Sequence, residues 1–132
     1  MENIIKTSVA VAGAAASFLW GGWSSLLSIL LAFVVIDYAS GVLAAAKQGE
    51  LSSEVGGWGI AKKVFIFAIV AVAHLIDTAI GEAHVFRDAT IFFYLANEVL
   101  SIIENAGVMG LPIPAKLKGA VDVLNQKGDD KQ

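Results

Sequence analysis

The segment from Ile91 to Asn105 most constrains what this chain can fold into. It is apolar and long enough for a helix, yet it contains Glu98 and Glu104. On a membrane-spanning helix, an acidic side chain near the bilayer centre costs about 2.5–3.5 kcal/mol, while each Leu, Ile, Phe or Val returns only about 0.3–0.6 kcal/mol. Such acids must face another helix or water, and at helical spacing the polar residues share one face. The polar face comprises Tyr94, Asn97, Glu98, Ser101 and Asn105, and the opposite face, expected to contact lipid, comprises Ile91, Leu95, Val99, Ile102 and Ile103.

The composition places the whole chain among membrane proteins. Of its 132 residues, 57% are hydrophobic and 16% are charged, and the mean hydropathy is +0.73. Soluble domains contain about 25% charged residues. The chain has no Cys, which excludes a disulfide framework and cysteine metal sites, and its net charge of −3 argues against a nucleic-acid partner. We predict a single all-α integral membrane domain over residues 1–132.

Three apolar stretches are predicted to cross the membrane as helices. About 20 apolar residues suffice to span roughly 30 Å of hydrocarbon. A short turn between the second and third stretches predicts that they form an antiparallel hairpin, and a polar, glycine-containing loop is expected between the first and second. The predicted spans cover residues 24–46, 60–80 and 88–106, and the predicted loop covers residues 47–63.

The two ends of the chain are predicted to form further helices. Residues 4–20 are weakly apolar and either cross the membrane as a fourth span or lie on it. A cleaved signal peptide is an alternative for this stretch, although Glu2 offsets the positive charge of Lys6 that such a peptide needs. Residues 115–126 are predicted to form a short amphipathic helix on the cytoplasmic side, in contact with headgroups or a partner.

Other helices also carry small or polar stripes. Asp37, Ser40 and Gly41 share one face of the first span, which suits either close helix packing or the lining of a pore. Gly13 lies in a stripe of small residues that would let helices approach closely. His74 and Asp77, three residues apart in the second span, can share a hydrogen bond or a proton.

The sequence offers no constellation for catalysis. It has no phosphate-binding glycine motif and no HExxH motif, and its two His residues lie in a span and in a short turn. An intramembrane hydrolase that pairs Asp37 with Asp77 is conceivable, but polar contacts between helices explain both acids more simply. We therefore predict no enzyme activity, no cofactor and no metal.

The distribution of Lys and Arg predicts the orientation. Lys47, Lys62 and Lys63 flank the first loop, Arg87 is alone in the hairpin turn, and four Lys follow the third span. Because the more basic segments stay inside, the loop and the C-terminus are expected to be cytoplasmic.

Four blocks of the sequence resemble the toxin secretion and phage lysis holin family, which includes clostridial toxin-release proteins. The resemblance covers about Trp20 to Leu117. The blocks are VIDYASGVLAA at 35–45, LSSEVGGWGIAKK at 51–63, HLID at 74–77 and FFYLANEVLSIIENAGVMGLPIP at 92–114.

This resemblance implies a small phage or prophage protein of the host bacterial cytoplasmic membrane. Such proteins accumulate harmlessly and then assemble with copies of themselves into lesions that release an endolysin or a toxin, without enzymatic activity. Some family genes also encode an inhibitor from a second start codon. Here the other Met is Met109, too late for such a product, so an antiholin would be separately encoded. The groups expected to line the pore or to pair between helices are Asp37, His74, Asp77, Asn97, Glu98, Ser101 and Glu104.

Two other functions compete with this one. A small ion channel or proton-coupled transporter would use His74 and Asp77 as a relay, although transporters are usually larger and built from internal repeats, which this sequence lacks. An assembly scaffold for other membrane proteins would open no passage at all. Release of a large cytosolic enzyme distinguishes the lysis protein from both.

Overall fold

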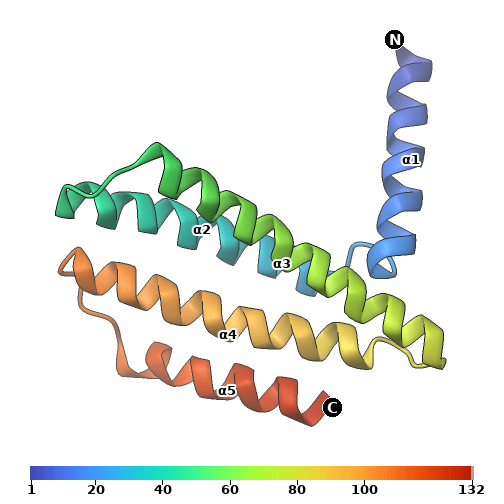
Figure 1. Cartoon of the computed structure of the whole chain (residues 1–132). Helices are drawn as coiled ribbons and strands as arrows, with labels where there is room; N and C mark the ends of the chain where they lie inside the picture. Colours follow the sequence, from blue (N-terminus) through green and yellow to red (C-terminus); the bar gives the residue numbers. More distant parts are fainter. Residues whose placement is uncertain (132) are drawn as a thin grey trace.

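The computed structural model describes residues 1–131, with side chains described to Asp130, and this part of the chain is helical without strands. Figure 1 shows the helices in chain order. Three of them lie side by side as an antiparallel bundle, and the first and last are attached to it. The helices are α1 (Glu2–Trp20), α2 (Ser25–Gln48), α3 (Ser53–Ile80), α4 (Val85–Val108) and α5 (Ala115–Lys131).

Local sequence signals fix where these helices begin and end. The Ser24 hydroxyl accepts a hydrogen bond from the Leu27 amide at 3.3 Å and caps the start of α2, as Ser and Thr commonly do. Gly49 ends the same helix at φ 71°, and Gly81 ends α3 at φ 76°. Glycine suits these ends because it has no Cβ to oppose a left-handed conformation.

The core of the bundle lies where α4 packs against α2 and α3. Leu27 and Leu30 from α2, Val70 from α3, and Ile91 and Leu95 from α4 are all almost fully buried in one cluster. The prediction that Ile91, Leu95 and Val99 face lipid is therefore wrong. Because α4 is the central helix, with neighbours on several sides, its apolar face supplies the core instead.

The connection between α2 and α3 is shorter than predicted. The helix α3 begins at Ser53, so the glycines expected in a loop lie in its first turns. The Tyr38 hydroxyl donates a hydrogen bond to the Gly56 carbonyl at 3.1 Å, and a Cβ on Gly56 would lie only 3.2 Å from that hydroxyl. Gly56 thus serves close packing between two helices rather than a turn.

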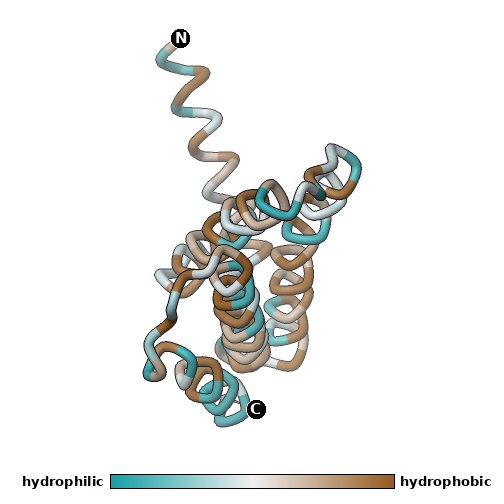
Figure 2. Tube along the Cα trace, turned by 90° about the vertical axis from the view of Figure 1, so that its left-hand side faces the viewer, coloured by the Kyte–Doolittle hydropathy of each residue, from teal (hydrophilic) through white to brown (hydrophobic). Residues whose placement is uncertain are grey.

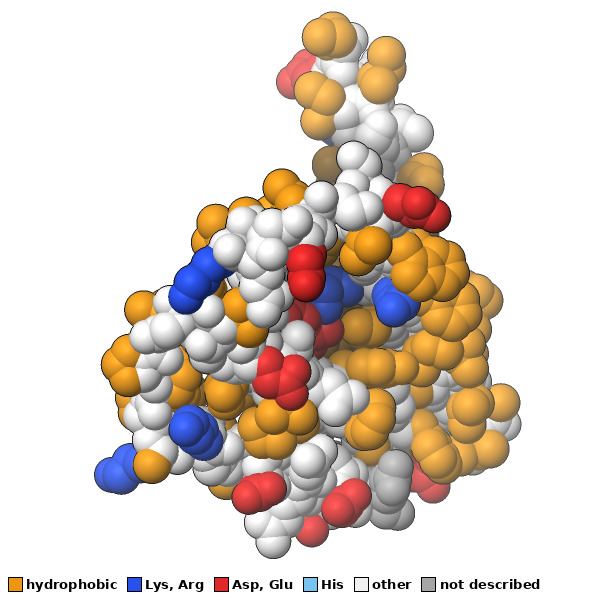
Figure 3. Space-filling view, turned by 60° about the vertical axis from the view of Figure 1, so that its left-hand side comes forward, with side chains coloured by type: hydrophobic (Ala, Val, Ile, Leu, Met, Phe, Trp, Pro, Cys, Tyr) orange, Lys and Arg blue, Asp and Glu red, His pale blue; other side chains and the backbone are white. Residues whose placement is uncertain are grey.

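Four helices, α1 to α4, are long and apolar enough to cross a membrane. Large hydrophobic side chains cover the outer faces of α2 and α3, and Figure 3 shows them spread over one flank of the molecule. These faces suit contact with lipid.

The first helix contacts the bundle at its C-terminal end, where Trp20 packs against the core cluster. It leaves the bundle crosswise in both Figure 1 and Figure 2, and it buries none of its residues. Gly13, predicted as a packing residue, has no partner within the described chain, because a Cβ added to it would meet no atom within 4 Å. In this arrangement α1 and the bundle cannot both lie along the membrane normal.

The last helix lies along α4 and extends past its predicted end at residue 126 to Lys131. Gly128 is buried against α4, where a Cβ would come within 3.3 Å of the Ala89 carbonyl and 3.4 Å of the Phe92 Cβ. Leu124 packs against the core cluster from the same side. The amphipathic helix was thus predicted, but its close packing along a membrane-spanning helix was not.

Candidate functional site

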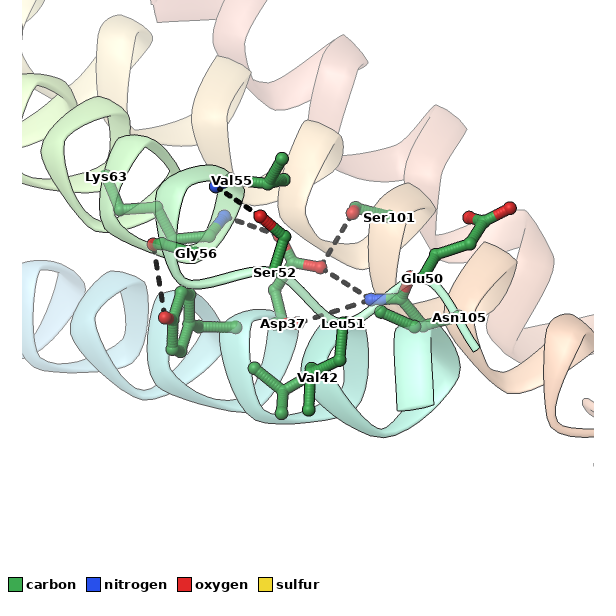
Figure 4. Close-up of a pocket in the computed structure, with 13 residues that line it drawn as sticks. Asp37, Val42, Glu50, Leu51, Ser52, Val55, Gly56, Lys63, Ser101 and Asn105 are labelled. Atoms are coloured by element: carbon green, nitrogen blue, oxygen red, sulfur yellow. Dashed lines mark hydrogen bonds and ion pairs between the residues drawn. The ribbon is translucent and has the colours of Figure 1, made fainter. Parts of the chain in front are cut away.

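Three charged side chains meet near the middle of the bundle, one from each of its helices. The Lys63 ammonium group donates to Asp37 Oδ2 at 2.5 Å and to both carboxylate oxygens of Glu98, at 3.1 Å and 3.0 Å. The carboxylates are almost fully buried, with 6% and 5% of their side chains exposed, and Lys63 is 19% exposed. We call Asp37, Lys63 and Glu98 the charge triad; Figure 4 shows Asp37 and Lys63 with their neighbours.

Neutral donors from α4 complete the hydrogen bonding of Asp37. The Ser101 hydroxyl donates to Asp37 Oδ1 at 2.6 Å, and the Asn105 amide donates to the same oxygen at 3.0 Å. The Asn105 amide also donates to the Ser40 hydroxyl at 2.9 Å. A Cβ on Gly41 would lie 3.6 Å from Nδ2 of Asn105. The small residues after Asp37 thus let α4 approach closely enough for these bonds.

The charge triad joins α2, α3 and α4 through ionic hydrogen bonds at membrane depth. A buried ion pair adds little net stability compared with apolar packing, but loss of one partner leaves an uncompensated charge at high cost. The triad therefore links these three helices by charged hydrogen bonds that depend on all three partners.

A crevice of about 310 Å³ leads to the triad from the end of the bundle that carries the α2–α3 connection. Glu50 and Ser52 line its outer part, and Asp37, Lys63 and Asn105 line its inner part (Figure 4). Polar residues at membrane depth are found facing such cavities or each other. The triad has both surroundings, because its charged groups face one another and the crevice reaches them.

A second polar cluster joins the other end of the bundle to the end of α1. Asp77 accepts hydrogen bonds from the backbone amides of Phe86 at 2.8 Å and Arg87 at 2.9 Å, at the start of α4. Arg87 donates to the Trp20 carbonyl at 2.8 Å and pairs with Asp88 at 2.9 Å. Asp77 therefore caps one helix, and Arg87 fixes the end of another.

Among the described residues the structure shows no hydrogen bond between His74 and Asp77, whose two carboxylate oxygens accept from the backbone of α4. His74 stacks instead on His84, with ring centroids 5.7 Å apart. Within the described residues neither Nδ1 has a hydrogen-bond partner. Gly21, at φ 74°, passes so close that a Cβ there would lie 2.7 Å from His74 Cε1. This contact explains a glycine at the corner after α1.

We expect Asp77→Ala to destabilise the first turn of α4. Loss of a capping side chain costs about 0.5–2 kcal/mol, and here two backbone amides lose their acceptor. In detergent, hydrogen exchange at the amides of Phe86 and Arg87 should become faster, with a lower midpoint of thermal unfolding. Glu82→Ala, which removes an exposed acid from the same turn, is the control; equal effects of the two changes would contradict the capping role.

Of the residues predicted to pair or to line a pore, the structure brings Asp37, Glu98 and Ser101 together. Asn97 and Glu104 lie elsewhere, on the exposed face of α4. Lys63 was predicted to lie in the loop, and Arg87 was considered for the orientation alone, so neither was expected in a buried polar cluster. A Lys three residues inside an apolar run that begins at Ile60 was the available signal. No group of three or more His, Asp or Glu within the described part of the chain is placed to hold a metal ion.

These features define the class as a multi-pass helical membrane protein that pairs its intramembrane charges internally. A model of the bacteriophage holin family matches residues 14–126. A relative named "probable holin" from Bacillus phage phi105 is 38% identical over 105 residues, covering 80% of this chain and 78% of its own. The chain therefore belongs to the bacteriophage holin family, whose members are membrane proteins rather than enzymes.

Bacterial relatives extend the similarity over the full length. An uncharacterized protein of Halalkalibacterium halodurans is 52% identical over 137 residues, with 100% of both chains covered. A 14.9 kDa protein in the nagH 3′ region of Clostridium perfringens is 39% identical over 131 residues, covering 96% of this chain and 99% of its own. No solved structure matches the chain.

Proposed function

We propose that this protein opens timed lesions in the cytoplasmic membrane of a host bacterium, through which an endolysin or a toxin leaves the cell. The observation that supports this most directly is the charge triad. A chain of this family carries three charges at membrane depth, and a single copy satisfies them internally. One copy has too few helices to enclose a wide passage, so the passage requires self-association.

In this proposal the charge triad is the element that keeps single copies harmless. While Lys63 stays between Asp37 and Glu98, the helices α2, α3 and α4 remain locked together and present apolar faces to lipid. During triggering, growing assemblies offer new partners to the same helices. Contacts between copies then replace lipid on the outer faces of these helices, while the charge triad stays within each copy.

The orientation rests on the basic residues near the ends of the spans. Lys63 no longer counts, because it lies in the charge triad, but Lys47, Lys62 and the four C-terminal Lys still outnumber the single Arg87 at the opposite end. The α2–α3 connection and the start of α5 are accordingly cytoplasmic in this proposal, and so is the C-terminus before α5 comes to lie along α4. Any antiholin comes from a separate gene, and the functional partner is a cell-wall hydrolase.

We expect co-expression with a cell-wall hydrolase that lacks a signal peptide to lyse bacterial cells abruptly after a delay. The hydrolase expressed alone should stay inside the cells. This protein expressed alone should reduce viability through the membrane lesion but should not clear the culture. The measurement is hydrolase activity in the medium together with culture density. A variant with Asp37→Ala and Lys63→Ala, which removes two of the three charges of the triad, shows how far hydrolase release depends on a correctly folded bundle.

The same experiment separates the competing functions. Leakage of ions without release of any protein would support a small channel and contradict the proposal. An intact membrane at high expression would support a scaffold.

A further inference from the structure

The position of α5 is at odds with its composition. It lies antiparallel along α4 (Figure 1), and Gly128 is buried beside Ala89 near the start of that helix. A helix of 17 residues is about 25 Å long, so α5 follows α4 through most of the depth of a membrane. Yet its outward side is charged, and Figure 3 shows charged side chains gathered along the lower edge of the molecule, where α5 lies.

Lipid cannot surround α5 in this position. A charged side chain near the bilayer centre is strongly disfavoured unless it faces a partner or water. Asp122, in the middle of α5, is exposed, and the structure gives it no salt bridge among the described residues. The outward side of α5 therefore requires water at the depth of α4.

Part of the polar side of α5 borders a groove against α4. Residues at spacings of four, three and four lie on one helical face, and on α5 these are Lys118, Asp122, Asn125 and Asp129. Asn125 and Asp129 line a groove of about 350 Å³ together with residues of α3 and α4, among them Thr90 and Tyr94. The exposed face of α4 carries Asn97 and Glu104, interleaved with Phe93 and Leu100, which are 53% and 45% exposed. We call Asn97 and Glu104 with these four residues of α5 the polar strip.

We propose that the polar strip forms the wall of the aqueous passage, with α5 lying along α4 only where that passage is open. The inference rests on the proposed function and adds which surface of each copy meets water. The outer faces of α2 and α3 meet lipid, where Ile36 and Val64 are 50% and 66% exposed. The charge triad stays inside each copy and does not line the passage.

In this proposal α5 also has a second position. Before a passage exists, lipid surrounds α4, and the charges of α5 keep it among the cytoplasmic headgroups, where an amphipathic helix is stable. Opening and docking of α5 are then one coupled event. The helix replaces lipid on α4 with a surface that water can wet.

Thiol labelling tests the proposal directly, because the chain contains no Cys. Single variants Asn97→Cys and Asp122→Cys place a thiol on the polar strip, and Ile36→Cys places one on the lipid face near the middle of α2. Each is expressed with the signal-less hydrolase and treated with a charged, membrane-impermeant thiol reagent before and after lysis begins. Hydrolase release is measured in the same cultures.

After release begins, Asn97→Cys and Asp122→Cys should react at least about tenfold faster than Ile36→Cys, because a charged reagent is excluded from hydrocarbon much as a charged side chain is. Before release, Asn97→Cys should be as unreactive as Ile36→Cys. If hydrolase is released while both polar-strip thiols stay unreactive, the proposed wall is wrong and the proposed function stands. If the unlabelled parent releases no hydrolase, the proposed function fails and the wall fails with it.

Discussion

Replacing Lys63 with Met should destabilise the protein more than any other single change in the bundle. The substitution leaves the carboxylates of Asp37 and Glu98 buried side by side without their common cation. Removing one partner of a buried ion pair costs about 3–5 kcal/mol. The midpoint of thermal unfolding in detergent should fall by roughly 10 °C or more, and cells should accumulate less of the protein.

Lys62→Met is the matched control, because Lys62 is the neighbouring residue on α3 but is exposed and outside the charge triad. It should unfold within a few degrees of the parent. Adding Glu98→Gln to Lys63→Met should recover part of the lost stability, since Asp37 keeps Ser101 and Asn105 as donors. Equal stability of the two single variants would show that the triad does not lock the helices.

The charge triad also affects timing in the proposed mechanism. Glu98→Gln alone keeps the shape of the side chain and weakens the link between α3 and α4, so lysis should begin earlier than in the parent. The time from induction to the fall in culture density measures this shift. A later onset, or an unchanged one at equal protein level, would contradict the role of the triad in keeping single copies harmless.

The sequence was sufficient to predict that the chain is built of helices and to place part of the polar face of α4. Apolar length identified the three spans, and helical spacing put Glu98, Ser101 and Asn105 on one side of α4, where the structure joins them to Asp37. Lys63 was not predicted as the partner of the two acids because the glycines around Trp58 indicate a loop. In the structure Gly56 and Gly59 lie inside a helix, where they make room for Tyr38. Glycine that permits a turn and glycine that permits close packing look alike in a sequence.

Hydropathy also could not distinguish lipid from a neighbouring helix. Ile91, Leu95 and Val99 are equally suited to both, and only the central position of α4 decides that they form the core. The packing of α5 was beyond prediction for a different reason. Its Leu and Val residues fit a membrane surface as well as they fit α4, and the contact at Gly128 depends on a residue far away in the sequence, Ala89.

Gly128→Val should prevent lysis or delay it severely while the protein still accumulates in the membrane. A Cβ at this position already comes within 3.3 Å of the Ala89 carbonyl, and the larger side chain would force α5 away from α4 at a cost of about 1–3 kcal/mol. If docked α5 forms the wall of the passage, its loss leaves lipid-facing residues where water must enter.

Gly119→Val is the control, because nothing lies within 4 Å of a Cβ at Gly119 and the helix-propensity change is the same. Culture density and membrane protein level should show normal lysis for Gly119→Val and arrested lysis for Gly128→Val, with Asp122→Cys in the Gly128→Val background losing its late reactivity. Lysis on the same schedule in both variants would mean that α5 does not need to lie along α4 for the passage to open.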